Sequence, residues 1–303
     1  MRKQLYSEPH DIIINKHHVT LTHCSKIIFP DHHITKADVI DYYLAIAPHM
    51  VPHLVSRPLT LLRFVNGITE EGFYQKEAAD YFPAWITRKK VPKKSGGFTQ
   101  YVVCNNAATL VYLTNQLTLT YHAWLSKTDA LTKPDRMIFD LDPAGKADFK
   151  DVAAAARLLH DYFAMRHIMP RLMTTGSRGV HVIISLKRNH TFDTVRAVAR
   201  SIAEWCVNQK PELVTLESRL KKRDNKIYLD VLRNAYAQTS VAPYSVRARP
   251  GAPVATPISW DELFAGSIRH ADQFTIKTIF DRLKHTNPWH HEAHSVSLDN
   301  LKL

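Results

Sequence analysis

The chain has 303 residues, with 40 Lys and Arg against 28 Asp and Glu, so its formal net charge is +12 and its isoelectric point is near 9.5. This length can bury a sizeable core in two lobes, and the charge points to a polyanionic partner, nucleic acid before an anionic membrane surface. No apolar run approaches the ~18 residues of a membrane span, and the first residues lack the apolar segment of a secretory signal. The three cysteines are far apart, and we expect reduced thiols in a cytosolic protein, without a disulfide framework or zinc site.

The first fifth of the chain predicts a leader and one long helix. Residues 1–20 are polar and rich in histidine, and we expect a loosely held leader that ends in a strand. Thr35 is a typical N-cap for a helix over residues 36–55. Pro48 and Pro52 remove backbone donors, so they should kink or split the second half of this helix.

Strands and a basic segment follow. Residues 59–64 and 73–76 predict two strands of a hairpin. Residues 88–97 carry five basic residues and two glycines, which predicts a mobile loop that either contacts phosphates or is a solvated turn. A buried helix over 105–119 then leads to a strand over 121–125.

Two acids stand in the apolar strand predicted over residues 135–143. Because side chains alternate along a strand, Asp140 and Asp142 share a face with Ile138, opposite the apolar Met137, Phe139 and Leu141. Two converging carboxylates repel each other unless a cation lies between them, so the pair suits Mg²⁺ or Mn²⁺. The alternative is two exposed acids on a half-solvated edge strand.

A glycine-containing loop follows the next predicted helix, which covers residues 151–168. Residues 173–179 hold two glycines, several hydroxyl groups and Arg178, and they precede a strand over 180–186. Such a loop either wraps phosphate oxygens or is an ordinary hairpin turn. It is not a Walker loop, because the Gly-Lys-Ser/Thr ending is missing.

The last third adds another acid in a strand. A helix over 192–207 and a basic cluster over 219–226 precede an apolar strand over 227–232 that contains Asp230. A short helix is predicted over 276–283, and the histidines of residues 290–294 are a weak candidate for a metal site, more typical of a solvated tail. Three strand acids, a hydroxyl-rich loop and a basic composition together favour metal-assisted chemistry on a phosphate chain.

The order and spacing of several motifs, from about Leu21 to Leu263, resemble the polymerase domain of bacterial ligase D. That domain is an archaeo-eukaryotic primase-like polymerase of non-homologous end joining. The motifs are KIIFP at 26–30, DYY at 41–43, RP at 57–58, FYQK at 73–76, HAW at 122–124, FDLDP at 139–143, TGSRGVH at 175–181 and VAPYSVRARP at 241–250.

The resemblance implies a role for each matching residue. It implies that two divalent ions (Mn²⁺ or Mg²⁺) are bound by a catalytic triad of acids, Asp140, Asp142 and Asp230. Asp230 would also assist the primer 3′-hydroxyl. It implies nucleotide-binding residues: His122, Thr175, Arg178, His181 and Arg247. It implies DNA contacts, of which two grip a 5′-phosphate and two stack on the template: Lys26, Lys36, Arg63, Phe73, Tyr74 and Lys76.

The resemblance also implies the fold and the partners. We expect an α+β fold of the archaeo-eukaryotic primase-polymerase type, with two lobes of mostly antiparallel sheets flanked by helices. After the leader, residues 21–303 would form one catalytic domain, with an N-terminal lobe over about 21–120 and a catalytic lobe over about 121–303. Implied partners are DNA with a 5′-phosphate gap or end, nucleoside triphosphates, a DNA ligase and a Ku-type end-binding protein, in the bacterial cytoplasm at the nucleoid.

Two positions depart from the family pattern, and two other functions compete. Family members usually have Ser at the position of Thr175 and often Lys at that of Arg178, so sugar selectivity is in question while a hydroxyl and a charge remain. A phosphatase of the haloacid dehalogenase type also uses Asp-x-Asp after an apolar strand, but normally near the N-terminus and followed by Gly-Thr. A non-catalytic DNA-end-binding module is the second alternative, supported by the charge.

Overall fold

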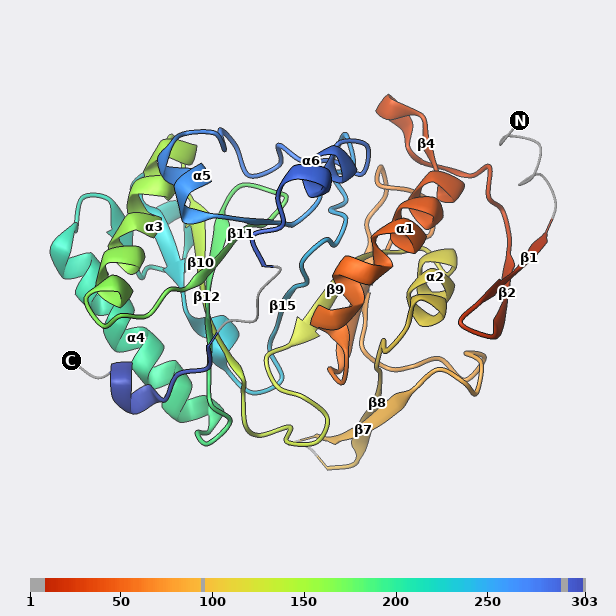
Figure 1. The fold of residues 1–303 in the computed structure, drawn as a ribbon, viewed down its shortest axis with the longest axis horizontal. Helices are drawn as coiled ribbons and strands as arrows, with labels where there is room; N and C mark the ends of the chain where they lie inside the picture. Colours follow the sequence, from red (N-terminus) through yellow and green to blue (C-terminus); the bar gives the residue numbers. More distant parts are fainter. Residues whose placement is uncertain (1–8, 94–95, 290–293, 302–303) are drawn as a thin grey trace. The chain divides into compact units, whose positions relative to one another are not determined.

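The chain divides into two compact units in the computed structural model, which describes residues 9–93, 96–289 and 294–301 (Figure 1). Unit 1 comprises Met1–Trp124 and Val241–Val254, and unit 2 comprises Leu125–Ser240 and Ala255–Leu303. Each unit therefore contains two separate stretches of the chain. Among the described residues, no helix combines the length and apolarity needed to cross a membrane.

A six-stranded sheet forms the centre of unit 2. In spatial order its strands are β13 (Val214–Thr215), β14 (Ile227–Asp230), β10 (Arg136–Pro143), β12 (Val180–Ser185), β11 (Arg171–Thr174) and β16 (Thr256–Ile258). Every neighbouring pair is antiparallel except β13 and β14. The acidic strand β10 lies between β14 and β12, so the edge-strand alternative is wrong.

Two helices cover one face of this sheet (Figure 1). They are α3 (Phe149–Ala164) and α4 (Phe192–Gln209), and their apolar sides share one core cluster with Met137, Phe139 and Leu141 of β10. All three of these β10 side chains are fully buried. The alternation predicted for this strand is confirmed, and the acids point to the opposite face.

The remaining helices of unit 2 are short. They are α5 (Trp260–Phe264), α6 (Ile279–His285) and the 3₁₀ turns η3 (Leu220–Lys222), η4 (Leu232–Asn234) and η5 (Leu298–Leu301). Helix α3 begins at Phe149, earlier than predicted, because Asp148 is its N-cap, and it ends at Ala164, before the predicted residue 168. The Asp148 carboxylate accepts the backbone N–H of Asp151, and the Asp151 carboxylate accepts that of Asp148.

Unit 1 combines a four-stranded sheet, two helices and three hairpins. The sheet runs β15 (Thr239–Val241), of which only Val241 belongs to unit 1, then β9 (Thr118–Trp124), β5 (Leu59–Arg63) and β6 (Phe73–Gln75). The helices are α1 (Lys36–Leu54) and α2 (Ala107–Asn115). The hairpins are β1 (His10–Ile14) with β2 (His17–Leu21), β3 (Ile27–Phe29) with β4 (Ile34–Thr35), and β7 (Arg88–Pro92) with β8 (Phe98–Val102), beside the turn η2 (Pro30–His32).

Helix α1 has the predicted limits and N-cap, but its two prolines lie inside one continuous helix. The Thr35 hydroxyl accepts the backbone N–H of Asp38, which closes a capping box. Pro48 and Pro52 are four residues apart and both face solvent together with Leu44. Water can therefore solvate the carbonyls that lose a donor, so the expected split does not occur.

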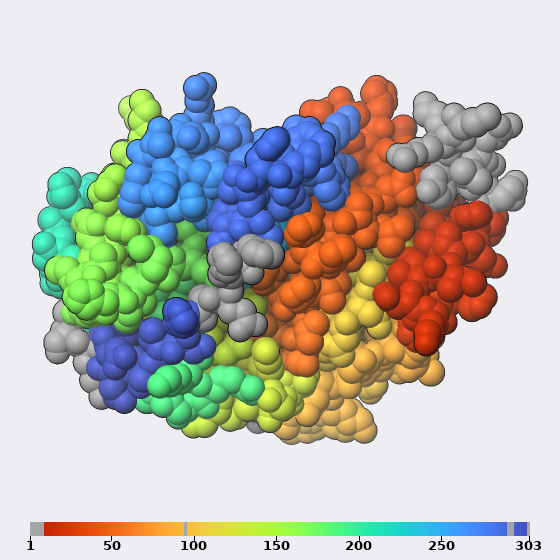
Figure 2. Space-filling view, in the orientation of Figure 1, coloured from red at the N-terminus to blue at the C-terminus, as the bar shows by residue number. Residues whose placement is uncertain are grey.

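The residues expected to form a loose leader are largely a packed hairpin. Within the described residues, β1 and β2 pair over their whole length, and Val19 and Leu21 are buried in a small apolar cluster with Val111 of α2. Figure 2 shows this hairpin, in red, lying against the yellow segment that contains α2. The polar composition concealed this packing because only one face of the hairpin is apolar.

The first half of the basic segment over 88–97 is a strand, not a loop. Residues 88–92 form strand β7, paired with β8 from Arg88↔Val102 to Pro92↔Phe98. The side chain of Val91 is buried, while Lys90 Nζ lies 4.5 Å from the ring centre of Phe98. Lys94 and Ser95 lie outside the described residues. Alternation around one buried valine was too short a signal to identify this strand.

Two further predictions concern α2 and the cysteines. Helix α2 is shorter than the predicted 105–119, because Leu117 adopts a φ of 64° and β9 begins at Thr118. All three cysteines, Cys24, Cys104 and Cys206, are free and buried. The expectation of thiols without a disulfide framework is therefore confirmed.

Candidate active site

The acids of β10 and β14 lie side by side because of the register between the two strands. Asp140 and Asp230 are direct cross-strand partners, and Asp142 lies two residues further along β10. Their side chains are 19%, 13% and 38% exposed, respectively. Three carboxylates thus lie on the face of the sheet opposite α3 and α4.

Buried backbone contacts hold both acidic strands in place. Strand β14 ends at Asp230, and the Asn234 side chain then takes over the pairing with β10: its Oδ1 accepts the N–H of Ile138 at 2.8 Å, and its Nδ2 donates to the Ile138 carbonyl at 2.7 Å. The Asp230 carboxylate accepts the N–H of Leu232 at 2.7 Å. These contacts fix the position of the Asp230 backbone and one of its oxygens.

The loop from Thr175 to Gly179 is the hairpin turn between β11 and β12, and it is pressed against β10. A Cβ at Gly179 would lie 1.8 Å from the carbonyl oxygen of Leu141, so only glycine fits there. The Thr175 hydroxyl donates to the Gly179 carbonyl at 3.1 Å and closes the turn. This approach brings Arg178 within 3.5 Å of the Asp142 carboxylate.

His181 lies under the acids as the cross-strand partner of Asp140. The side chain is buried, with Nε2 3.4 Å from Asp140 Oδ1 and Nδ1 3.3 Å from the Ser240 hydroxyl. A hydroxyl on one ring nitrogen and a carboxylate on the other hold the imidazole in a defined orientation.

Two more arginines approach the acids. Arg223 NH1 lies 3.3 Å from Asp142 Oδ2. The Nε of Arg233 lies 3.8 Å from Asp140 Oδ2 and 3.6 Å from Asp230 Oδ2, so it bridges the two strands. With Arg178, three guanidinium groups surround three carboxylates.

Burial, more than charge, alters the proton affinity of the third acid. Burial raises the pKa of Asp230 above its usual value, and the neighbouring Asp140 charge adds to the rise, whereas the Leu232 N–H and Arg233 lower it. Burial and the Asp230 charge also raise the pKa of Tyr228 to about 12. A cation at this site would favour the ionised form of Asp230.

The donor chemistry fits a hard divalent ion, because carboxylate oxygens are the ligands that Mg²⁺ and Mn²⁺ prefer. The cluster is not a ready-made cage, however. In the described part of the chain, no three or more His, Cys, Asp or Glu side chains come close enough together to hold a metal ion as they stand. The carboxylates instead face arginine and histidine, so a metal would have to exchange with these partners.

The other predicted contacts belong to unit 1. Phe73 and Tyr74 stand exposed on the edge strand β6, with 47% and 64% of their surface accessible. The Arg63 guanidinium lies 5.5 Å from the Phe73 ring centre, and the His122 ring lies 5.7 Å from that of Tyr74. Exposed neighbouring aromatic rings beside a cation suit base stacking, and these roles stay predictions.

Three predicted lysines and one arginine differ in exposure. Lys36 is buried, and its ammonium donates to the Thr22 carbonyl. Burial lowers the Lys36 pKa to about 8. Lys26 and Arg247 are half-buried and Lys76 is exposed. Their predicted contacts with phosphates are not tested by this geometry.

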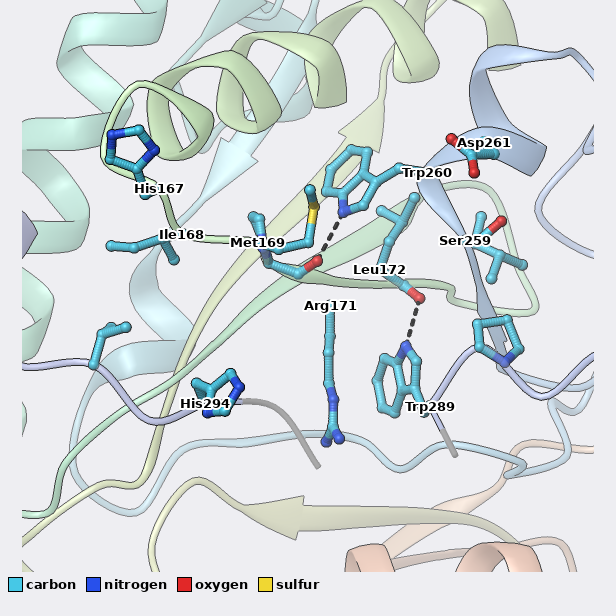
Figure 3. Close-up of a pocket in the computed structure, with 14 residues that line it drawn as sticks. His167, Ile168, Met169, Arg171, Leu172, Ser259, Trp260, Asp261, Trp289 and His294 are labelled. Carbon is cyan, nitrogen blue, oxygen red and sulfur yellow. Dashed lines mark hydrogen bonds between the residues drawn. The ribbon is translucent and has the colours of Figure 1, made fainter. Parts of the chain in front are cut away.

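A cavity of about 540 Å³ lies elsewhere in unit 2, beside the start of β11 and the end of β16 (Figure 3). The indole N–H groups of Trp260 and Trp289 donate to the carbonyls of Pro170 and Leu172, which fixes its walls. None of the three acids lines it. Of the predicted histidine cluster, His294 lines this cavity, whereas residues 290–293 lie outside the described residues.

Sequence reasoning missed four residues that shape the acidic cluster. Arg223 lies in the predicted basic cluster over 219–226, and the sequence predicts no role for Arg233, Asn234 or Ser240. The spacing of Arg233, three residues after Asp230, was the one available signal, because it allows an ion pair across a helical turn. Nothing in the sequence indicated that Asn234 would bond β10.

Comparison with known proteins is consistent with this fold and site. Residues 35–289 match the family model described as "LigD, primase-polymerase domain". This match covers well over half of the chain, which therefore belongs to the LigD primase-polymerase family and is a nucleotidyltransferase. Membership sets aside the phosphatase alternative, and the predicted α+β fold with mostly antiparallel sheets is confirmed.

Individual relatives agree with the family. The chain is 33% identical over 267 residues to the multifunctional non-homologous end joining protein LigD of Mycolicibacterium smegmatis, covering 88% of this chain and 34% of that protein. It is 34% identical over 264 residues to the bifunctional LigD of Bacillus subtilis, covering 87% of this chain and 42% of that protein. The chain thus spans well under half the length of these curated relatives.

A solved structure is similar over nearly the whole fold. The polymerase domain from Mycobacterium tuberculosis ligase D in complex with DNA superposes with a TM-score of 0.83 at 28% identity, covering 89% of this chain and 96% of that one.

Proposed function

We propose that the chain adds nucleotides, including ribonucleotides, to a primer 3′-hydroxyl at DNA gaps or double-strand-break ends during non-homologous end joining. The observation that carries this proposal is the pairing of Asp140 with Asp230 across β10 and β14, with Asp142 beside them. Template dependence, the end-joining pathway and a nucleoid location are also parts of the proposal, and the names of the relatives support the end-joining pathway.

The acids would hold two divalent ions, Mn²⁺ or Mg²⁺. When bound, such ions lower the pKa of the attacking hydroxyl and neutralise charge on the phosphates. Asp230, the most buried of the three acids, would accept the proton of the primer hydroxyl.

The hairpin turn between β11 and β12 would hold the triphosphate. Thr175 and Arg178 supply a hydroxyl and a charge, and His181 lies beside Asp140. We propose nucleotide contacts for His122 and Arg247 as well. Because Thr175 stands where the family usually has serine, its extra methyl group is a candidate determinant of sugar selectivity.

The DNA would be bound largely through phosphates and stacked bases. We propose that Phe73 and Tyr74 stack on the template, and that Arg63 and Lys76 provide nearby charge. Lys26 and Lys36 would grip a 5′-phosphate. A DNA ligase and a Ku-type end-binding protein are further proposed partners.

The test is extension of a primed, 5′-phosphorylated gap with Mn²⁺ and ribonucleotides. We expect the wild type to add the templated nucleotide, and Asp140→Asn to lose extension while its DNA affinity persists. That affinity should fall steeply with salt, since phosphate contacts release counterions. A wild type that binds the gap but never extends it would support the non-catalytic end-binding alternative and refute the polymerase.

A further inference from the structure

The three acids are completely partnered by donors of unit 2. Each of their oxygens lies near a nitrogen of a side chain or of the backbone. The contacts are Asp140 Oδ1 with His181 at 3.4 Å and Oδ2 with Arg233 at 3.8 Å, Asp142 Oδ1 with Arg178 at 3.5 Å and Oδ2 with Arg223 at 3.3 Å, and Asp230 Oδ1 with Leu232 N at 2.7 Å and Oδ2 with Arg233 at 3.6 Å. A metal ion that binds these acids must therefore compete with these donors.

The donors differ in how firmly they are held. Arg223 is 9% exposed, donates to the carbonyls of Glu217 and Ser218, and lies over the Tyr228 ring at 4.1 Å. Arg233, in contrast, is 44% exposed. Its side chain starts in the short turn η4, from which it can swing into solvent.

Arg233 is also the one side chain in this set that pairs with two acids. It joins Asp140 to Asp230, the two carboxylates that are direct cross-strand partners. A divalent ion shared by these carboxylates would lie next to the guanidinium, and the two like charges would repel each other.

We propose that Arg233 is a positioning residue that sets the affinity of the acidic site for its divalent ion. The guanidinium neutralises Asp140 and Asp230 and turns away when they take a metal. This inference rests on the proposed function in that it assigns the ion to these acids. It follows that the protein alone binds the ion weakly, and that a triphosphate strengthens binding by supplying negative charge that Arg233 does not neutralise.

The test measures Mn²⁺ binding to the nucleotide-free protein, by electron paramagnetic resonance of free Mn²⁺ and by calorimetry. Arg233→Met removes the charge but keeps an unbranched apolar side chain, and we expect it to bind Mn²⁺ about tenfold more tightly than the wild type. Arg233→Lys should stay close to the wild type. Arg200→Met is the matched control, because Arg200 is 66% exposed on α4 and pairs with Glu204 instead of the acids; it should change nothing.

Several outcomes decide the matter. Unchanged or weaker Mn²⁺ binding in Arg233→Met overturns the inference while leaving the proposed function intact. Equal tightening in Arg200→Met also overturns it, because net charge would then explain the effect. A third outcome concerns the Asp140→Asn substitution, made in the wild type and in Arg233→Met. If this substitution abolishes no Mn²⁺ binding in either protein, the acids do not hold the ion. The metal site of the proposed function then fails, and the inference fails with it.

Discussion

Adding one methyl group at Gly179 should lower the rate of nucleotide addition far more than it lowers folding stability. In Gly179→Ala the new Cβ would meet the Leu141 carbonyl oxygen at 1.8 Å, and real Cβ contacts are essentially never below 3.0 Å. The turn must therefore move away from β10 by more than about 1 Å. Thr175 moves with it, because its backbone N–H and its hydroxyl both donate to the Gly179 carbonyl.

The expected cost of Gly179→Ala is about 1–3 kcal/mol of folding stability, as for other overpacked sites. The expected loss of nucleotide addition is larger, about 100-fold, because a misplacement of 1 Å in a positioned group can cost that much. Chemical denaturation and single-turnover gap filling measure the two effects.

Gly266→Ala is the control for Gly179→Ala. Gly266 has a φ of 72°, which strains any side chain, but nothing lies within 4 Å of its Cβ position. We expect it to lose about 1 kcal/mol of stability and no activity. Wild-type nucleotide addition by Gly179→Ala would refute the view that this turn must lie against β10 to hold the nucleotide.

Three further predictions concern unit 1. Burial lowers the Lys36 pKa to about 8, so the unfolded chain binds this proton more tightly than the folded chain does. The stability of the wild type relative to Lys36→Met, measured by urea denaturation, should therefore rise by at most about 3 kcal/mol as the pH increases from 8 to 10.5. A difference in stability that stays constant over this pH range would contradict the prediction. Thr35→Ala should cost about 1 kcal/mol of stability through loss of the α1 cap, whereas Thr35→Ser should cost little; equal melting of the two variants would refute the capping role. Phe73→Ala and Tyr74→Ala should each weaken binding to gapped DNA about 5- to 100-fold without changing the melting temperature. Ile13, which is 68% exposed on β1, provides the control, because Ile13→Ala should change neither the DNA affinity nor the melting temperature. Unaltered DNA affinity in Phe73→Ala and Tyr74→Ala would exclude stacking.

Local patterns in the sequence predicted the acidic strand and the first helix well. Alternation separated Met137, Phe139 and Leu141 from the acids because one face of β10 is buried under helices. Thr35 marked the start of α1 because few side chains can accept an N–H at that position. Such signals are local, and therefore readable without knowledge of the fold.

Contacts between distant segments could not be predicted in the same way. The pairing of Asp140 with Asp230 depends on a strand register across 90 positions, and the closure of β10 by Asn234 depends on where β14 ends. The family resemblance supplied the three acids as a set. It did not predict that Arg178, Arg223 and Arg233 pair with these acids, because those ion pairs depend on distances in the folded chain.

The central claim is that Asp140, Asp142 and Asp230 together hold the ions that serve nucleotidyl transfer. Anomalous diffraction at the manganese edge, from crystals grown with Mn²⁺, gapped DNA and a non-hydrolysable ribonucleoside triphosphate, tests it most directly. We predict anomalous peaks within about 2.0–2.4 Å of oxygens from all three acids. Peaks confined to other parts of the protein, with the three carboxylates still paired to Arg178, Arg223 and Arg233, would contradict it.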